Sequence, residues 1–408
     1  MGNQYSEASS MKEICRGIRE CKRGVSYKDG PMEWYIHSYT KGKKLKDDIT
    51  TGRYKLRPGT KVQIYRPKRR EAVAPWFRDR VWQRCMCNNG VYDDLTRGLT
   101  YDNTACQKGK GTDQAIRRTI KMLQQIYRET GSNQGWGIHR DVRKYFPSTP
   151  HSSIHELDRQ RITDPMFLPF LDEIVDSLHD ERPPEIIAAD PYGERGTGLG
   201  SQINQLHQVA LLSPIDHELL TISKHSQRYM DDFLVLDAEK DTCIRAGETI
   251  DWMLAERGFQ SVDKSGLFRL SDGFYFLRHF FKLTETGKVI VRLHPDTLKL
   301  ERDALRGQKR LLDRGETTME KIRVHYQCFI AQAEYSTGDG AIRAMDKFYT
   351  ELFREKPTYK RKRRYFYGNQ NHQRAAPRGA PEERSADGPA RPGECGPAVP
   401  GDDYRHRP

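Results

Sequence analysis

The sequence predicts an α+β fold built around an antiparallel sheet, and three observations lead to this prediction. The stretch "GWGIHRDVRKYF" (residues 135–146) has the pattern of a strand that enters a tight turn. The stretch "RYMDDFLVL" (residues 228–236) is apolar with polar residues on both sides, as in a short buried strand or hairpin. Helical patterns precede and follow that hairpin, so the central order is strand, helix, hairpin, helix, strand. This βαββαβ order places helices on one face of an antiparallel sheet.

The flanking segments are predicted in the same way. Residues 1–55 are mixed and basic, and "KVQIYRPKRREAVAP" (residues 61–75) alternates as a hairpin with a basic turn. A helix is expected from Thr112, its N-cap, to Gly131, with an apolar face that comprises Ile116, Ile120, Leu123 and Tyr127.

The later part of the chain is expected to hold helices, then strands, then helices again. Asp164 and Pro165 form a standard helix start, and "AGETIDWMLAERG" is helical and stops at Gly258. Two strands should turn at Thr286-Gly287, and residues 296–355 are mostly helical in pattern. The basic, Pro- and Gly-rich stretch after Lys356 lacks an apolar period and is expected to be disordered.

Composition narrows the classes of function. With 408 residues, 36% hydrophobic and 31% charged, the chain is expected to be a soluble protein of two or three domains. Residues 1–80 hold 20 Lys and Arg against 9 Asp and Glu, and most of the net charge of +13. Such a basic region with interleaved Tyr and Trp indicates contact with a polyanion, most simply nucleic acid, although a solvated basic surface is the alternative.

The cysteines and the hydropathy bear on location and metal binding. Eight scattered cysteines without a CxxC pair make a zinc module improbable and fit a reducing, cytoplasmic setting. No run of 18 apolar residues occurs, so we expect neither a membrane span nor membrane association.

Asp231 and Asp232 stand side by side in the buried hairpin, where two adjacent carboxylates are costly without an offsetting cation. In the βαββαβ order, the strand that ends at Asp141 can lie beside this hairpin, so three carboxylates would converge on the open face. Two Mg²⁺ ions, with Mn²⁺ as a substitute, would offset the charge. Such a pair would activate an attacking 3′-hydroxyl and stabilise a leaving pyrophosphate.

At these residues the sequence resembles the reverse transcriptases of bacterial retroelements, in particular group-II-intron-like and diversity-generating-retroelement-like enzymes. The resemblance covers about residues 55–300, with a weaker continuation to about residue 352. Its motifs arrive in the family's order: "PKRREAVAP", "FRDRVWQ", "ACQKGKGTDQAIRR", "DVRKYF", "GLGSQINQ", "YMDD", "GFQSVDKSG" and "FLRHFF" with "LTETGKVI".

The resemblance implies roles for individual residues. Asp141, Asp231 and Asp232 would be the metal ligands, and Lys264 would protonate the leaving pyrophosphate. Four residues would contact the incoming nucleotide: Lys68 and Arg70 at its triphosphate, Phe146 under its sugar, and Gln205 in the glycine motif. The alternatives are a plain basic hairpin for Lys68 and Arg70, a solvated lysine for Lys264 and a core residue for Phe146.

Two departures from the family pattern stand out. Many relatives end the glycine motif in Ser-Pro, whereas this chain has Asn204-Gln205, which leaves fidelity and subfamily open. The usual Gly of the primer-grip motif is Arg278, which puts the local turn in doubt.

The implied architecture is that of a right-hand polymerase with fingers, palm and thumb. Its expected parts are a basic extension (1–54), fingers (55–134), a palm with the aspartates (135–295), a helical thumb (296–355) and a disordered basic tail (356–408). The expected activity is RNA-directed DNA polymerase, with RNA template, DNA primer and deoxynucleoside triphosphates as partners, and with a dedicated non-coding RNA or accessory protein. A templateless or protein-primed nucleotidyltransferase and a catalytically dead RNA-binding scaffold are the alternatives. Retrohoming, diversification, phage defence and spacer acquisition all remain open as roles.

Overall fold

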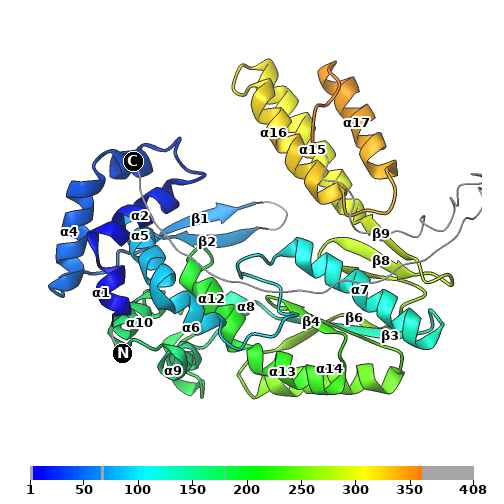
Figure 1. Cartoon of the computed structure of the whole chain (residues 1–408), viewed down its shortest axis with the longest axis horizontal. Helices are drawn as coiled ribbons and strands as arrows, with labels where there is room; N and C mark the ends of the chain where they lie inside the picture. Colours follow the sequence, from blue (N-terminus) through cyan, green and yellow to red (C-terminus); the bar gives the residue numbers. More distant parts are fainter. Residues whose placement is uncertain (1–2, 66–68, 179, 361–408) are drawn as a thin grey trace, which may run out of the picture. The chain divides into compact units, whose positions relative to one another are not determined.

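The computed structural model describes residues 3–65, 69–178 and 180–360 (Figure 1). The predicted disordered tail falls almost wholly on residues 361–408, outside the described residues. Among the described helices, none is long and apolar enough to cross a membrane.

The first part of the chain is helical rather than mixed. It folds into α1 (Gln4–Ala8), α2 (Met11–Lys22), α3 (Asp29–Ile36) and α4 (Ser38–Thr50). The apolar side of α2, with Ile14 and Ile18, packs on α5 (Phe77–Met86) and shares one core with Trp82 and Cys85. The described residues of the predicted N-terminal extension (1–54) therefore contribute side chains to the main core.

The predicted hairpin at residues 61–75 is confirmed. Strands β1 (Thr60–Ile64) and β2 (Arg70–Ala74) pair antiparallel, with Ile64 opposite Arg70. The helix predicted from Thr112 is also confirmed as α7 (Thr112–Thr130). Its N-cap is Gly111 rather than Thr112, and it ends at Gly131, which takes a left-handed conformation (φ +66°).

The centre of the molecule is a four-stranded antiparallel sheet in the order β4-β5-β3-β6. The strands are β3 (Trp136–Val142), β4 (Ser226–Tyr229), β5 (Asp232–Asp237) and β6 (Ser261–Arg269). With helices between β3 and β4 and a helix between β5 and β6, the chain follows the predicted βαββαβ order.

Two helices cover one face of this sheet: α13 (Ser213–Ile222) contacts β4, and α14 (Lys240–Ala255) contacts β3, β5 and β6 (Figure 1). The contact with α14 is close, because a Cβ at Gly247 would lie 2.2 Å from the Ile138 side chain. Helices are not confined to this face. Thr119 of α7 accepts a hydrogen bond from Gln227 of β4 (2.6 Å) on the opposite face, so α7 covers part of that face.

Helices and turns connect these parts. Between β2 and α7 lie α5, a kinked turn η1 (Cys87–Val91) with non-helical Asn89 and Gly90, and α6 (Tyr92–Thr96). Between β3 and β4, besides α13, lie α8 (Tyr145–Ser148), α9 (His151–Arg161), η2 (Pro165–Phe167), α10 (Leu168–Asp176), α11 (Pro184–Ala189) and α12 (Gln202–Leu211). Asp164 caps η2 through its hydrogen bond from the Met166 backbone N–H, as the sequence predicts.

The sequence predicts two strands near Thr286-Gly287, whereas the structure has three. They form a separate antiparallel sheet of β7 (Phe274–Phe276), β8 (His279–Leu283) and β9 (Val289–Leu293). Both residues of the β7–β8 turn, Leu277 (φ +46°) and Arg278 (φ +62°), are left-handed. Helices α15 (Pro295–Asp313), α16 (Met319–Ala333) and α17 (Gly340–Phe353) follow, as expected for residues 296–355, and enclose a core of their own.

Candidate active site at the tip of the β4–β5 hairpin

The turn that joins β4 and β5 holds the predicted site residue Asp231, and Asp232 follows it as the first residue of β5. Tyr229 pairs with Asp232, so Met230 and Asp231 alone form the turn. Met230 has φ +58°, a left-handed backbone conformation that residues other than Gly rarely adopt. Strain of this kind persists only where surrounding contacts enforce it, and it clusters at functional sites.

Arg228 supplies the enforcing contacts. This fully buried guanidinium donates to the Met230 carbonyl (2.8 Å) and to the Val209 carbonyl (2.8 Å). It also forms two hydrogen bonds with the buried Asp216 carboxylate (2.6 and 2.8 Å). Burial lowers the pKa of Arg228, but the Asp216 charge outweighs burial, so its pKa stays above the ordinary value. Arg228, charged and paired with Asp216, therefore holds the Met230 turn in place.

The strand register brings Asp141 to this turn. Since Arg140 pairs with Phe233 in the antiparallel β3–β5 ladder, Asp141 is the next residue along and faces Asp232. Both side chains lie on the face opposite α14, because Arg140 points the other way and contacts Asp251 of that helix (3.2 Å). The predicted convergence of the β3 and β5 carboxylates follows from this register.

Lys264 comes to the same place from β6. The β3–β6 register shifts between Ile138 and Arg140, which leaves an irregularity of the β-bulge type around Lys264, with Gly266 at φ +62°. The Lys264 ammonium lies 2.9 Å from Asp141 Oδ2 and also contacts Asp232 Oδ1. Burial lowers the pKa of Lys264, but Asp232 and Asp141 outweigh it, so the pKa is raised and the side chain stays charged.

His139 is a further member of this group, and the sequence analysis did not identify it. Its Nε2 lies 3.3 Å from Asp232 Oδ1, and its ring packs edge-on against Phe276 of β7. Burial raises the pKa of Asp232, but the His139 hydrogen bond and the Lys264 charge outweigh burial and hold this pKa below its usual range. A carboxylate accepts but cannot donate when ionised, so Nε2 carries the ring proton.

The pKa of Asp231 shifts in the opposite direction to that of Asp232. Burial, followed by the charges of Asp141 and Asp232, raises the pKa of Asp231 to about 7. The three carboxyl groups thus repel one another enough to oppose ionisation of all three at once. Lys264 offsets the charge of Asp141 and Asp232, and additional positive charge would be needed to keep Asp231 ionised as well.

Metal binding by these side chains depends on how their oxygen atoms are arranged. Among the described residues, no group of three or more His, Cys, Asp or Glu side chains has an arrangement able to hold a metal ion as it stands. The donor set nevertheless fits a hard cation, since carboxylate oxygens are what Mg²⁺ prefers. Asp141 Oδ1 is buried and has no hydrogen-bond partner among the described residues, so it is available to a cation. A cation bound between Asp141 and Asp232 would have to displace the Lys264 ammonium.

Phe146 lies just beyond β3, in α8. Its neighbour Tyr145 points into the core and donates to the Gln208 carbonyl (2.6 Å), whereas Phe146 is only half-buried. The Phe146 carbonyl accepts from the Thr197 backbone N–H (2.9 Å), so the glycine-rich loop at residues 196–200 runs beside it. Tyr145 thus takes the fully buried position, and Phe146 lies half-buried beside it, with the two ring centroids 6.0 Å apart.

The glycine-rich loop also holds the β1–β2 hairpin, because the Val73 backbone N–H donates to the Leu199 carbonyl (2.8 Å). A Cβ at Gly200 (φ +137°) would lie 2.4 Å from the Val73 carbonyl oxygen, so this close approach requires glycine. Arg70 begins β2 and is exposed. Lys68 lies outside the described residues.

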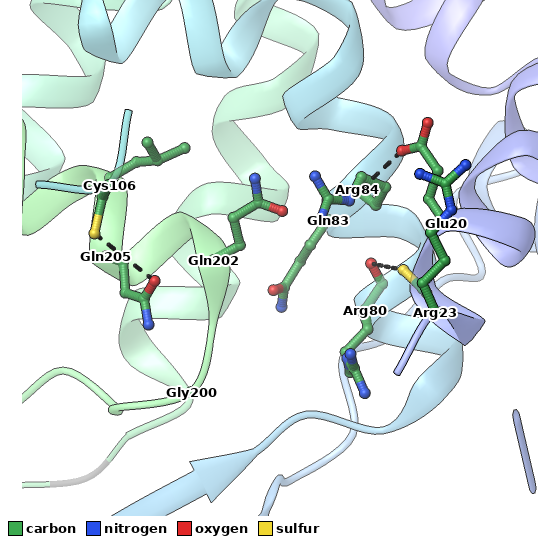
Figure 2. Close-up of a pocket in the computed structure, with 11 residues that line it drawn as sticks. Glu20, Arg23, Arg80, Gln83, Arg84, Cys106, Gly200, Gln202 and Gln205 are labelled. Atoms are coloured by element: carbon green, nitrogen blue, oxygen red, sulfur yellow. Dashed lines mark hydrogen bonds and ion pairs between the residues drawn. The ribbon is translucent and has the colours of Figure 1, made fainter. Parts of the chain in front are cut away.

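Gln205 lines a cavity of about 590 Å³ (Figure 2). The cavity adjoins the β4–β5 hairpin. Its Oε1 lies 3.9 Å from Cys106 Sγ, which lies 3.5 Å from Met230 Sδ. Arg80 and Arg84 of α5 also line this cavity, and so does Arg23, which follows α2. These arginines were not singled out in the sequence because nothing local marks α2 and α5 as neighbours of "GLGSQINQ".

Taken together, the fold and site define an α+β protein with carboxylates, a lysine and a polar, arginine-lined cavity around one strained hairpin. No protein-family model matches the sequence, and no curated protein is similar to it. Among solved structures, an apo telomerase from Candida tropicalis truncated from its C-terminal domain is similar, with a TM-score of 0.39 and 11% sequence identity. The similarity covers 62% of this chain and 60% of that chain, and at this TM-score it carries no argument about function.

Proposed function

We propose that this chain is a nucleotidyltransferase, specifically an RNA-directed DNA polymerase that extends a primer 3′ end with deoxynucleotides. The observation that carries the proposal is the meeting of Asp141, Asp232 and Lys264 at the strained hairpin that holds Asp231. The βαββαβ order and the resemblance to bacterial retroelement reverse transcriptases support the same conclusion.

Asp141, Asp231 and Asp232 would hold two Mg²⁺ ions, or Mn²⁺ in their place. When bound, these ions would activate the 3′-hydroxyl and stabilise the charge that develops on the leaving pyrophosphate. Arg228 fixes the turn so that Asp231 and Asp232 keep their places, and His139 orients Asp232. Lys264, displaced from Asp141 and Asp232 by the ions, would lie near the leaving group as a charged ammonium and donate a proton to it.

The incoming nucleotide would lie between the hairpin tip and the glycine-rich loop. Phe146 would stand under its sugar and exclude a 2′-hydroxyl, Gln205 would contact it from the cavity, and Arg70 with Lys68 would bind its triphosphate. The basic residues at the N-terminal end and along α15 and α16 would bind phosphates of the template and product, so affinity should fall steeply with salt. A dedicated non-coding RNA or accessory protein is part of the proposal, because it would supply a template or an integration step.

The test is primer extension by the wild type and by Asp231→Asn, with Asp237→Asn as the matched control. Asp237 ends β5, the strand that follows Asp231, but it accepts a hydrogen bond from the Ser223 hydroxyl (2.7 Å), away from the site. We expect Asp231→Asn to abolish extension while RNA binding stays largely intact, and Asp237→Asn to remain active. Extension near the wild-type rate in Asp231→Asn would contradict the proposal.

The same assay separates the related activities. If the wild type extends the primer at the same rate with and without an RNA template, it is a templateless enzyme. RNA binding without extension, in either Mg²⁺ or Mn²⁺, would identify a non-catalytic scaffold.

A further inference from the structure

The N-terminal helices expose aromatic side chains that do not serve the core. All eight residues of α3 are at least partly exposed. Tyr27, just before α3, is 78% exposed, Tyr39 in α4 is 71% exposed, and Tyr35 is also exposed. Large aromatic side chains are mostly buried in soluble proteins, so three exposed tyrosines on adjacent segments mark a surface with a binding role. We call Tyr27, Tyr35 and Tyr39 the tyrosine platform.

Basic side chains accompany the tyrosine platform. The Lys22 ammonium lies 3.4 Å from the centroid of the Tyr35 ring, and that of Lys28 lies 5.8 Å from the Tyr27 ring. Tyr39 lines a hollow of about 520 Å³ on α4 together with Lys43 and Lys44.

Acidic residues share this region, and some of them are paired. Asp47 and Asp48 also line the hollow, but Asp48 pairs with Arg53 (3.9 Å) and Arg78 (4.0 Å). Glu33 on α3 pairs with Lys41 (2.6 Å). Asp29 at the start of α3 and Asp47, one turn along α4 from Lys43 and Lys44, are the further acidic groups here, against the four lysines Lys22, Lys28, Lys43 and Lys44.

The tyrosine platform is linked along the chain to the cavity beside the candidate active site. Arg23 lines that cavity, and its chain neighbour Lys22 covers Tyr35. Glu20 is the acidic residue of the cavity, and it pairs with Arg16 (3.0 Å) and Arg84 (3.8 Å). Figure 2 shows Arg23, Arg80 and Arg84 around the cavity whose other side holds Gln205. Arginines therefore line the cavity, and Lys22, next to Arg23 in the chain, connects it to the Tyr35 ring.

We propose that the tyrosine platform and its lysines bind single-stranded RNA, namely the part of the template that has not yet been copied. Unpaired bases stack on exposed aromatic rings, and cations along the same surface bind the phosphates between them. Duplex ends lack free bases for such stacking, and the alternation of rings and cations suits a strand better than a folded protein. The inference rests on the proposed function, because it takes the strand that leaves the cavity as template.

The test measures the dissociation constant of primer–template duplexes whose template carries a 5′ single-stranded extension of 0, 4, 8 or 16 nucleotides. The variant is Tyr35→Ala/Tyr39→Ala, and the control is Trp252→Ala, an exposed aromatic on α14 (63% exposed). We expect the wild type and the control to gain affinity as the extension lengthens. The double variant should lose about tenfold or more of that gain, because each stacked base contributes several-fold. Addition of the first nucleotide to a saturating duplex with the 4-nucleotide extension should be unchanged in all three proteins.

Three outcomes would overturn the inference. The first is the same dependence on extension length in the double variant as in the wild type. The second is no dependence in the wild type, which would point to a protein partner for this surface. The third is an equal effect when the same oligonucleotide is supplied as a separate molecule, which would assign the surface to another RNA. Failure of the proposed function is distinguishable, because the wild type would then extend no primer on any template.

Discussion

At the scale of single residues, Arg228 shows how the hairpin tolerates adjacent carboxylates. Its guanidinium joins Asp216, the Met230 carbonyl and the Val209 carbonyl, all away from solvent. Removing one partner of a buried ion pair leaves an uncompensated charge, which typically costs about 3–5 kcal/mol. We expect Arg228→Met to lose this much free energy of unfolding in urea. Arg245→Met, at an exposed arginine on α14, should change it by less than about 0.5 kcal/mol. An Arg228→Met protein as stable as the wild type would show that the turn keeps its conformation without the guanidinium.

Phe146 determines, in the proposed function, the choice of deoxynucleotides over ribonucleotides. A rigid ring beneath the sugar rejects a 2′-hydroxyl by steric exclusion, so a smaller side chain should admit it. We expect Phe146→Ala to raise the ratio of ribonucleotide to deoxynucleotide addition at least tenfold, which corresponds to about 1.4 kcal/mol. Tyr145→Phe, which removes a hydroxyl from the adjacent core position, should leave the ratio unchanged. An equal fall of both rates in Phe146→Ala would instead show a structural role.

At the scale of elements, patterns that depend on near neighbours could be predicted and long-range contacts could not. The β1–β2 hairpin and α7 follow from alternation, a 3.6-residue period and a terminal Gly, all within one segment. Helices α3 and α4 escaped prediction because α3 has little apolar periodicity and α4 buries Gly42 in its middle. The meeting of Asp141 with Asp232 could be anticipated from strand order. The placing of His139 against Asp232 needs the register, and the arginines of the cavity need the packing of α2 on α5.

The β7–β8 turn bears out the doubt that Arg278 raised. Phe276 pairs with His279, so Leu277 and Arg278 form a two-residue turn with both φ angles positive. Such turns favour Gly or Asn, and a residue with a Cβ costs about 1–2 kcal/mol there. We expect Arg278→Gly to raise the free energy of unfolding by about 1 kcal/mol, whereas Arg278→Ala keeps the strain and should not raise it. Equal stability of the two variants, measured by chemical denaturation, would contradict this account.

At the scale of the whole molecule, the helices at the two ends of the described chain relate differently to the core. Helices α1 to α4 add their apolar residues to the main core, whereas α15 to α17 enclose Leu305, Ile322, Tyr326 and Met345 in a core of their own. The N-terminal helices therefore cannot be removed without exposing α5. The last three helices can in principle lose or gain stability with less effect on the rest.

Two glycines test this difference. Gly17 lies where α2 crosses α5, and a Cβ there would be 2.9 Å from Cys85 Sγ and 3.3 Å from the Val81 carbonyl oxygen. We expect Gly17→Leu to overpack this contact and to destabilise the main core by about 1–3 kcal/mol or more. Gly307 lies within α15, where a Cβ would meet no atom closer than 3.9 Å. Gly307→Ala should stabilise its helix by about 0.5–1 kcal/mol, since alanine loses less backbone entropy on folding.

Hydrogen exchange read by mass spectrometry can follow both variants, because it reports the local free energy of opening for each helix. In Gly17→Leu, protection should fall together in α2, α5 and the other elements of the main core, and much less in α15 to α17. In Gly307→Ala, protection should rise in α15 to α17 alone. A loss confined to α2 in Gly17→Leu would mean that the N-terminal helices are an appendage after all, and that the main core is complete without them.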